Sequence, residues 1–202
     1  MDTQLHIQQG PTCGVYSLAY ALHKLDIKVI PDDSELQGWA QCVAFDNEIN
    51  KGCNPVALTH FINSQTSFLD GLTATLYANV DGLCANASAE IQQLLKTLQG
   101  YARVQLDNLY INEDYNYKNL KEGQICIGIF VSGRYNEDDV KVPFVKQFAE
   151  NAAALHYMMI EKMDGQCVVY DSNVGERKEF VIQDNVANGY AYSGLAIVLE
   201  QK

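Results

Sequence analysis

The spacing of apolar residues changes about half-way along this 202-residue chain, and that change most constrains its fold. The first half has apolar residues at helical spacing, about 3.6 residues apart, which predicts helices over 13–25, 33–45, 54–63 and 88–98. Short apolar runs predict strands over 72–80, 101–105, 125–131, 154–161, 167–170, 179–182 and 195–199. Helices followed by an antiparallel meander are typical of the α+β class.

The length suits one domain over residues 1–202, with a helical part over about 1–100 and a sheet part over about 101–202. Two cap positions are predicted: Thr12 for the first helix, and Asp33 or Ser34 for the second. Pro55 is expected at the first position of the third helix, where its missing N–H costs nothing.

Charge and hydropathy limit which classes of partner the protein can bind and where in the cell it is expected. The formal net charge of −11 argues against nucleic acid as a partner, because phosphate contacts need clustered Lys and Arg. No apolar stretch approaches the roughly 18–20 residues of a membrane span. The first nine residues lack the apolar centre of a signal peptide. We therefore expect a cytoplasmic protein, or one exported without a cleaved signal peptide. The oligomeric state stays open.

Six cysteines could suggest a disulfide set, but their wide spacing in a long chain favours reduced thiols. They are Cys13, Cys42, Cys53, Cys84, Cys126 and Cys167. No Cys-x-x-Cys pair predicts a zinc site, so neither a metal nor another cofactor is expected. One of the six differs from the rest in its sequence context.

That residue is Cys13, at the expected start of the first helix. A helix N-terminus carries about half a positive charge and free N–H groups, which favour a thiolate over a thiol. Gly10 and Pro11 would form a tight turn before it, and Gly14 is expected to let a substrate approach closely. The Cys13 N–H, with the side-chain amide of Gln8 or alternatively Gln9, could stabilise an oxyanion.

A thiolate nucleophile needs a general base, and the base needs an acceptor that orients it. Among the four histidines, His156 lies on a predicted strand, and Asp171 ends the next strand. A turn at Asp164-Gly165 would place Tyr157 opposite Asp171, so that His156 comes within one step of it. Asn173 is the alternative orienting residue. Each residue also has an ordinary interpretation: a core thiol, a core histidine, a turn-opening aspartate.

The motif Gln-x-Gly-Pro-x-Cys-Gly-x-x-Ser-Leu at residues 8–18, followed by His156 and Asp171, resembles the papain-like cysteine peptidase superfamily. It is most similar to compact branches: bacteriocin-processing (double-glycine) peptidases, phytochelatin synthases and actin-maturation proteases. The papain string Cys-Gly-Ser-Cys-Trp is absent. The oxyanion glutamine of such families often lies six residues before the cysteine, where this chain has Ile7, and Gln8 lies one residue later.

The resemblance implies a nucleophile helix packed on a C-terminal antiparallel sheet, with Cys13, His156 and Asp171 as the catalytic set. It implies a thiol-dependent peptidase that cleaves a peptide or isopeptide bond of a peptide or protein substrate. Three alternatives remain: an acyltransferase or transpeptidase with the same triad, a secreted or injected effector toxin, and a non-catalytic binding module.

Overall fold

The computed structural model describes residues 7–27, 31–65, 69, 71–78, 97–98, 109–111, 117–132, 155–174, 176–182 and 186–201. The strand expected over 101–105 lies outside these residues, as does the helix expected over 88–98 apart from its last two. Cys84 also lies outside them.

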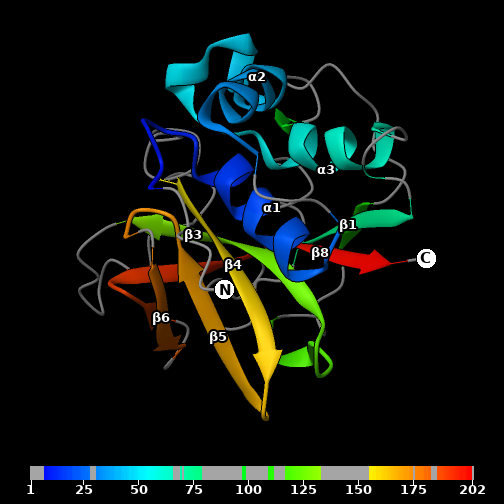
Figure 1. The fold of residues 1–202 in the computed structure, drawn as a ribbon, viewed down its shortest axis with the longest axis vertical. Coiled ribbons are helices and arrows are strands. Elements are labelled where there is room, and N and C mark those ends of the chain that lie inside the picture. Colours follow the sequence, from blue (N-terminus) through cyan, green and yellow to red (C-terminus); the bar gives the residue numbers. More distant parts are fainter. Residues whose placement is uncertain are drawn as a thin grey trace.

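Helices α1 and α3 pack against one face of a sheet, and α2 packs on α1 and α3 (Figure 1). They are α1 (Cys13–Lys24), α2 (Asp33–Val43) and α3 (Pro55–Ser64). Short 3₁₀ turns are η1 (Phe45–Asn47), η2 (Ile49–Lys51) and η3 (Tyr117–Asn119). Among the described helices none is both long and apolar enough to cross a membrane.

The described strands form a single sheet in the order β2-β1-β8-β3-β4-β5-β6, with β7 beside β8. The strands are β1 (Leu72–Ala78), β2 (Leu109–Ile111), β3 (Ile125–Ser132), β4 (Leu155–Met163), β5 (Gln166–Asp171), β6 (Glu176–Val181), β7 (Val186–Ala187) and β8 (Tyr190–Gln201). The pair β1–β2 is parallel and the other pairs are antiparallel. The α+β class is confirmed. Strand β1 comes from the first half of the chain but lies inside the sheet beside β8.

Polar side chains fix where two of the helices begin. Asn54 caps α3, since its Oδ1 accepts from Val56 N at 2.9 Å, and Pro55 follows it as predicted. The cap predicted for α2 was wrong by one residue: Asp32 accepts from Glu35 N at 2.9 Å. Thr12 stands before α1 but makes no side-chain cap, because its hydroxyl donates to the carbonyl of Gln9.

The turn between β4 and β5 corrects the predicted pairing by one residue. Asp164 and Gly165 form a two-residue turn with φ of 49° and 77°, which pairs Met163 with Gln166 and Met159 with Tyr170. Continued along the strands, this register brings Asp171 opposite residue 158. The predicted pairing of Tyr157 with Asp171 was therefore wrong, and it would have set His156 and Asp171 on opposite faces of the sheet.

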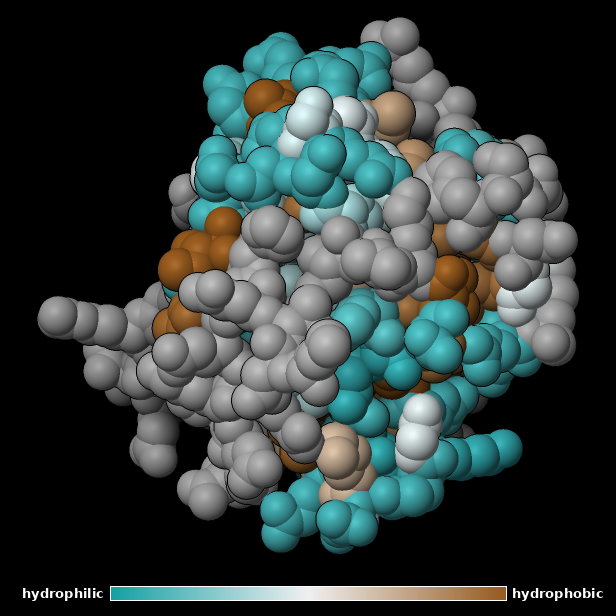
Figure 2. Space-filling view, in the orientation of Figure 1, coloured by the Kyte–Doolittle hydropathy of each residue, from teal (hydrophilic) through white to brown (hydrophobic). Residues whose placement is uncertain are grey.

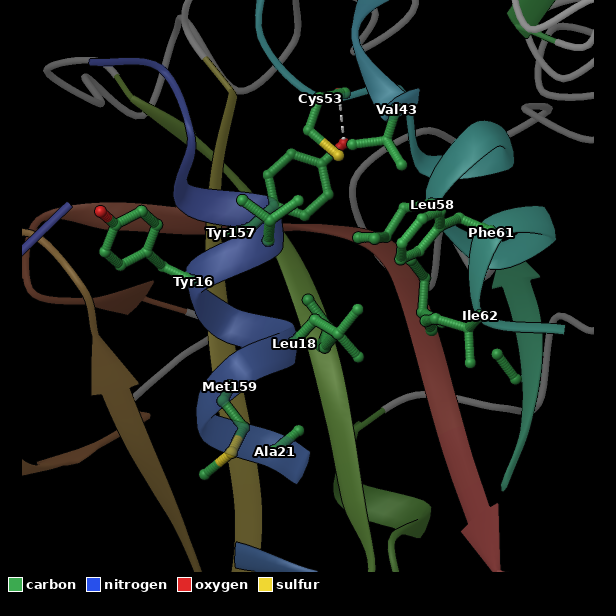
Figure 3. Packing of buried hydrophobic residues seen from close by; sticks show 14 of the residues in the cluster. Tyr16, Leu18, Ala21, Val43, Cys53, Leu58, Phe61, Ile62, Tyr157 and Met159 are labelled. Carbon is green, nitrogen blue, oxygen red and sulfur yellow. Dashed lines mark hydrogen bonds between the residues drawn. The ribbon is translucent and has the colours of Figure 1, made fainter. Parts of the chain in front are cut away.

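The hydrophobic core fills the space between the helices and one face of the sheet (Figure 3). Leu18 of α1, Leu58 of α3 and Met159 of β4 are fully buried in it. Residues of the opposite sheet face, such as Met158 and Ile160, belong to a second buried cluster. The surface over α2 is mainly hydrophilic in the view of Figure 2. This packing holds the start of α1 against the ends of β4 and β5.

Candidate active site

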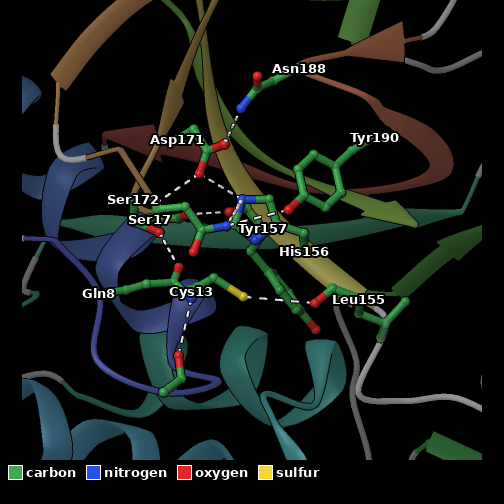
Figure 4. A network of polar contacts seen from close by, with 12 residues as sticks. Gln8, Cys13, Ser17, Leu155, His156, Tyr157, Asp171, Ser172, Asn188 and Tyr190 are labelled. Atoms are coloured by element: carbon green, nitrogen blue, oxygen red, sulfur yellow. Dashed lines mark hydrogen bonds and ion pairs between the residues drawn. The ribbon is translucent and has the colours of Figure 1, made fainter. Parts of the chain in front are cut away.

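Three elements bring the predicted catalytic residues together (Figure 4). Cys13 is the first residue of α1, His156 the second of β4 and Asp171 the last of β5. All three are buried, with 5%, 4% and 1% of their surface exposed. Because each residue lies at the end of an element packed in the core, the backbone positions of all three are set by the fold.

The imidazole of His156 and the carboxylate of Asp171 are in direct contact. His156 Nε2 lies 2.7 Å from Asp171 Oδ1. Nε2 is occupied in this way, so the other ring nitrogen, Nδ1, remains for a second partner. Cys13 lies near enough to His156 that its interaction with the imidazole raises the pKa of the ring. The Cys13 Sγ itself donates to the backbone carbonyl oxygen of Leu155, the residue before His156, at 3.9 Å (Figure 4).

This environment favours the protonated imidazole. Burial lowers the pKa of His156, but the hydrogen bond to Asp171, the neighbouring Cys13 and the charge of Asp171 outweigh that effect. The pKa rises from 6.5 to about 9 as a result. At neutral pH the ring is an imidazolium that can give up a proton.

Asp171 is held ionised by its partners. Burial raises the pKa of this carboxyl, but the hydrogen bond and charge of His156, followed by two further donors, bring it below its ordinary value. The backbone N–H of Asn173 donates to Oδ1 at 2.8 Å, and Nδ2 of Asn188 donates to Oδ2 at 2.8 Å. Between them, three donors occupy both carboxylate oxygens.

Asn173, the alternative orienting residue, lies beside the pair. Its Nδ2 is 3.4 Å from His156 Nε2, a longer contact than the 2.7 Å of Asp171. The closer contribution of Asn173 is its backbone N–H to Asp171, as in an Asx turn. Of the two candidates, Asp171 is thus the one in closer contact with the imidazole.

The two candidate glutamines have different surroundings. Oε1 of Gln8 accepts from Ser172 Oγ at 2.6 Å, and its backbone N donates to Ser172 O at 3.0 Å. Nε2 of Gln8 donates to Gly10 O at 3.1 Å. The Nε2 of Gln9 instead donates to Asp33 Oδ2 on α2 at 3.0 Å. Gln8 is therefore the glutamine tied to the strand end that carries Asp171.

Gly14 faces another part of the protein, not the open space expected for a close substrate approach. A Cβ added at Gly14 would lie 2.6 Å from Cys53 Sγ and 2.8 Å from Cys53 Cβ. Real Cβ atoms essentially never come this close to another heavy atom. The glycine that follows Cys13 thus serves the packing of α1 against the loop that carries Cys53.

Three residues of the site were missed by sequence reasoning: Ser172, Asn188 and Tyr190. The Tyr190 ring packs on His156, with ring centroids 4.6 Å apart and planes inclined by 36°. Asn188 lies in the turn between β7 and β8, and Tyr190 is the first residue of β8. The Asn188-Gly189 dipeptide is a recognised hairpin signal, but a local signal does not indicate which distant residues the turn will contact.

Four further cysteines lie in the part of the chain that the structure describes. Cys53 and Cys126 are buried, and burial raises the pKa of both thiols. Cys167 is partly buried and Cys42 is exposed on α2. In the part of the chain that the structure describes, no three His, Cys, Asp or Glu side chains are grouped to hold a metal ion.

Comparisons with known proteins add no relative: no family model, no curated protein and no solved structure matches the chain.

Proposed function

We propose that this protein is a thiol-dependent peptidase of the papain-like type, which cleaves a peptide or isopeptide bond in a peptide or protein substrate. The supporting observation is the direct contact of His156 with Asp171, together with the placement of Cys13 at the start of α1, beside the same imidazole and in contact with the preceding residue, Leu155. A nucleophile, a base and an orienting acceptor in this order are the requirements of covalent catalysis by a thiol. The start of α1 adds positive potential and free N–H groups at the sulfur.

In the first half of the reaction, the Cys13 thiolate attacks the substrate carbonyl and forms a tetrahedral intermediate. The Cys13 N–H donates to its oxyanion, as does the Gln8 Nε2 hydrogen that is not bonded to Gly10 O. The His156 imidazolium, favoured by the pKa of about 9, gives its proton to the leaving amine. The C–N bond breaks, the amine departs, and a thioester joins the acyl group to Cys13.

In the second half, neutral His156 takes a proton from water while the water oxygen attacks the thioester carbonyl. The C–S bond breaks, and the products are the carboxylic acid and the Cys13 thiolate beside a renewed imidazolium. Asp171 stays ionised throughout and stabilises the imidazolium each time it forms. No proton or electron is needed from any other group.

The test compares the wild-type protein with Cys13→Ala on a library of peptides, with products weighed by mass spectrometry. The variant should lose several orders of magnitude in rate while it keeps its circular dichroism spectrum. The matched control is Cys42→Ala, which removes an exposed thiol and should keep full activity.

Labelling provides an independent check. Thiolate character governs alkylation more than exposure does, so iodoacetamide should modify Cys13 before Cys42 although Cys13 is only 5% exposed. A Cys13 that reacts no faster than Cys42, together with a Cys13→Ala variant of full activity, would refute the proposal.

A further inference from the structure

The turn between β7 and β8 supplies an amide to the candidate site from a distant part of the sequence. Ala187 pairs with Tyr190, which leaves Asn188 and Gly189 as a two-residue turn with φ of 49° and 80°. In this turn the side chain of Asn188 reaches Asp171, 17 residues earlier, and donates to Oδ2 at 2.8 Å (Figure 4).

The two oxygens of Asp171 have separate tasks. Oδ1 faces His156 Nε2 at 2.7 Å and accepts from the backbone N–H of Asn173. Oδ2 accepts from Asn188. A carboxylate that is 1% exposed needs such donors to stay charged, and a donor at Oδ2 also opposes rotation of the group away from the imidazole.

We propose that Asn188 is a positioning residue, which keeps Asp171 ionised and aimed at His156. This role rests on the proposed function in so far as it concerns catalysis. Asn188 acts through Asp171, which contacts His156, and His156 in turn serves Cys13. The turn is suited to the task because Asn readily adopts the left-handed backbone that places its amide here.

Two substitutions at Asn188 separate this role from a structural one. Glycine keeps the left-handed backbone and removes the donor. Aspartate keeps the shape and replaces the donor by a second carboxylate. The matched control is Asn47→Gly, at an exposed residue with φ of 60° in η1.

The measurement is the pKa of Asp171, followed by carbon-13 NMR of its carboxyl and assigned with the Asp171→Asn variant. The titratable groups around this carboxyl and its imidazole partner are Cys13 and Tyr20 of α1, His156 of β4 and Tyr190 of β8. All of them are retained in the Asn188 variants, so a shift is assigned to Asn188.

Asn188→Gly should raise the pKa of Asp171 by about one unit, because a donor to the carboxylate is lost. Asn188→Asp places a second carboxylate beside Asp171, and because two like charges this close share a proton, one of the two carboxyls should have a higher pKa still. Asn47→Gly should leave the titration unchanged. Asn188→Gly should also lower kcat about tenfold with KM unchanged.

Identical Asp171 titrations in the wild type and both Asn188 variants would overturn the role. A shifted pKa with unchanged kcat in an active enzyme would overturn its catalytic part. If the wild-type protein hydrolyses no substrate but the Asp171 shift occurs, the proposed function fails while the positioning of Asp171 by Asn188 stands.

Discussion

Gly14→Ala is the substitution with the most sharply defined structural consequence. The new methyl group would lie 2.6 Å from Cys53 Sγ and 2.8 Å from Cys53 Cβ. Cys53 has little freedom to move away, because it is 5% exposed, its carbonyl accepts from Tyr157 OH at 2.7 Å, and it bridges to Ala44. Overpacking of this kind typically costs about 1–3 kcal/mol.

The intrinsic preference of a helix for alanine over glycine offsets part of that cost, by up to about 1 kcal/mol. We therefore expect Gly14→Ala to lower the free energy of unfolding by about 1–2 kcal/mol. The matched control is Gly38→Ala inside α2, where an added Cβ meets no atom within 4 Å. There only the helix preference acts, and the variant should be more stable than the wild type by up to about 1 kcal/mol.

The assay is urea denaturation of Gly14→Ala, Cys53→Ala, the double variant and Gly38→Ala. Cys53→Ala removes the sulfur that lies 2.6 Å away but keeps the Cβ at 2.8 Å, so the rescue should be partial. Gly14→Ala should cost less in the Cys53→Ala background, by about 0.5–1 kcal/mol. A Gly14→Ala variant as stable as Gly38→Ala, or strictly additive effects, would refute the packing of Gly14 against Cys53.

Two further predictions concern the proposed reaction. In Asp171→Asn, only Cys13 opposes the effect of burial on His156, so the pKa of His156 should fall from about 9. The alkaline limb of kcat/KM, where the imidazolium is lost, should then move to lower pH by about one unit or more. NMR of His156 measures the pKa, and a pH–rate profile measures the limb. Ser172→Ala removes the hydroxyl that holds the Gln8 side-chain amide in place, so kcat should fall about tenfold with KM unchanged. A change in KM alone would contradict the role of Gln8 at the oxyanion.

The candidate site shows which features local sequence patterns can predict and which they cannot. The start of α1 at Cys13 and the ends of β4 and β5 were predicted within a few residues, because hydrophobic periodicity and turn residues are local properties. The pairing of β4 with β5 was predicted one residue out of register. That error concerned the geometry of the Asp164-Gly165 turn, where two left-handed residues close the hairpin with no third residue.

The sequence by itself determined the α+β class and the local placement of Cys13, His156 and Asp171, since each depends on the pattern of its own segment. Only the tertiary structure decided which side chains meet. It placed Asn188 on Asp171, Ser172 on Gln8 and Tyr190 on His156, and it set Gly14 against Cys53. These contacts join segments up to 164 residues apart, so they depend on how strands and helices pack and leave no local periodic signal.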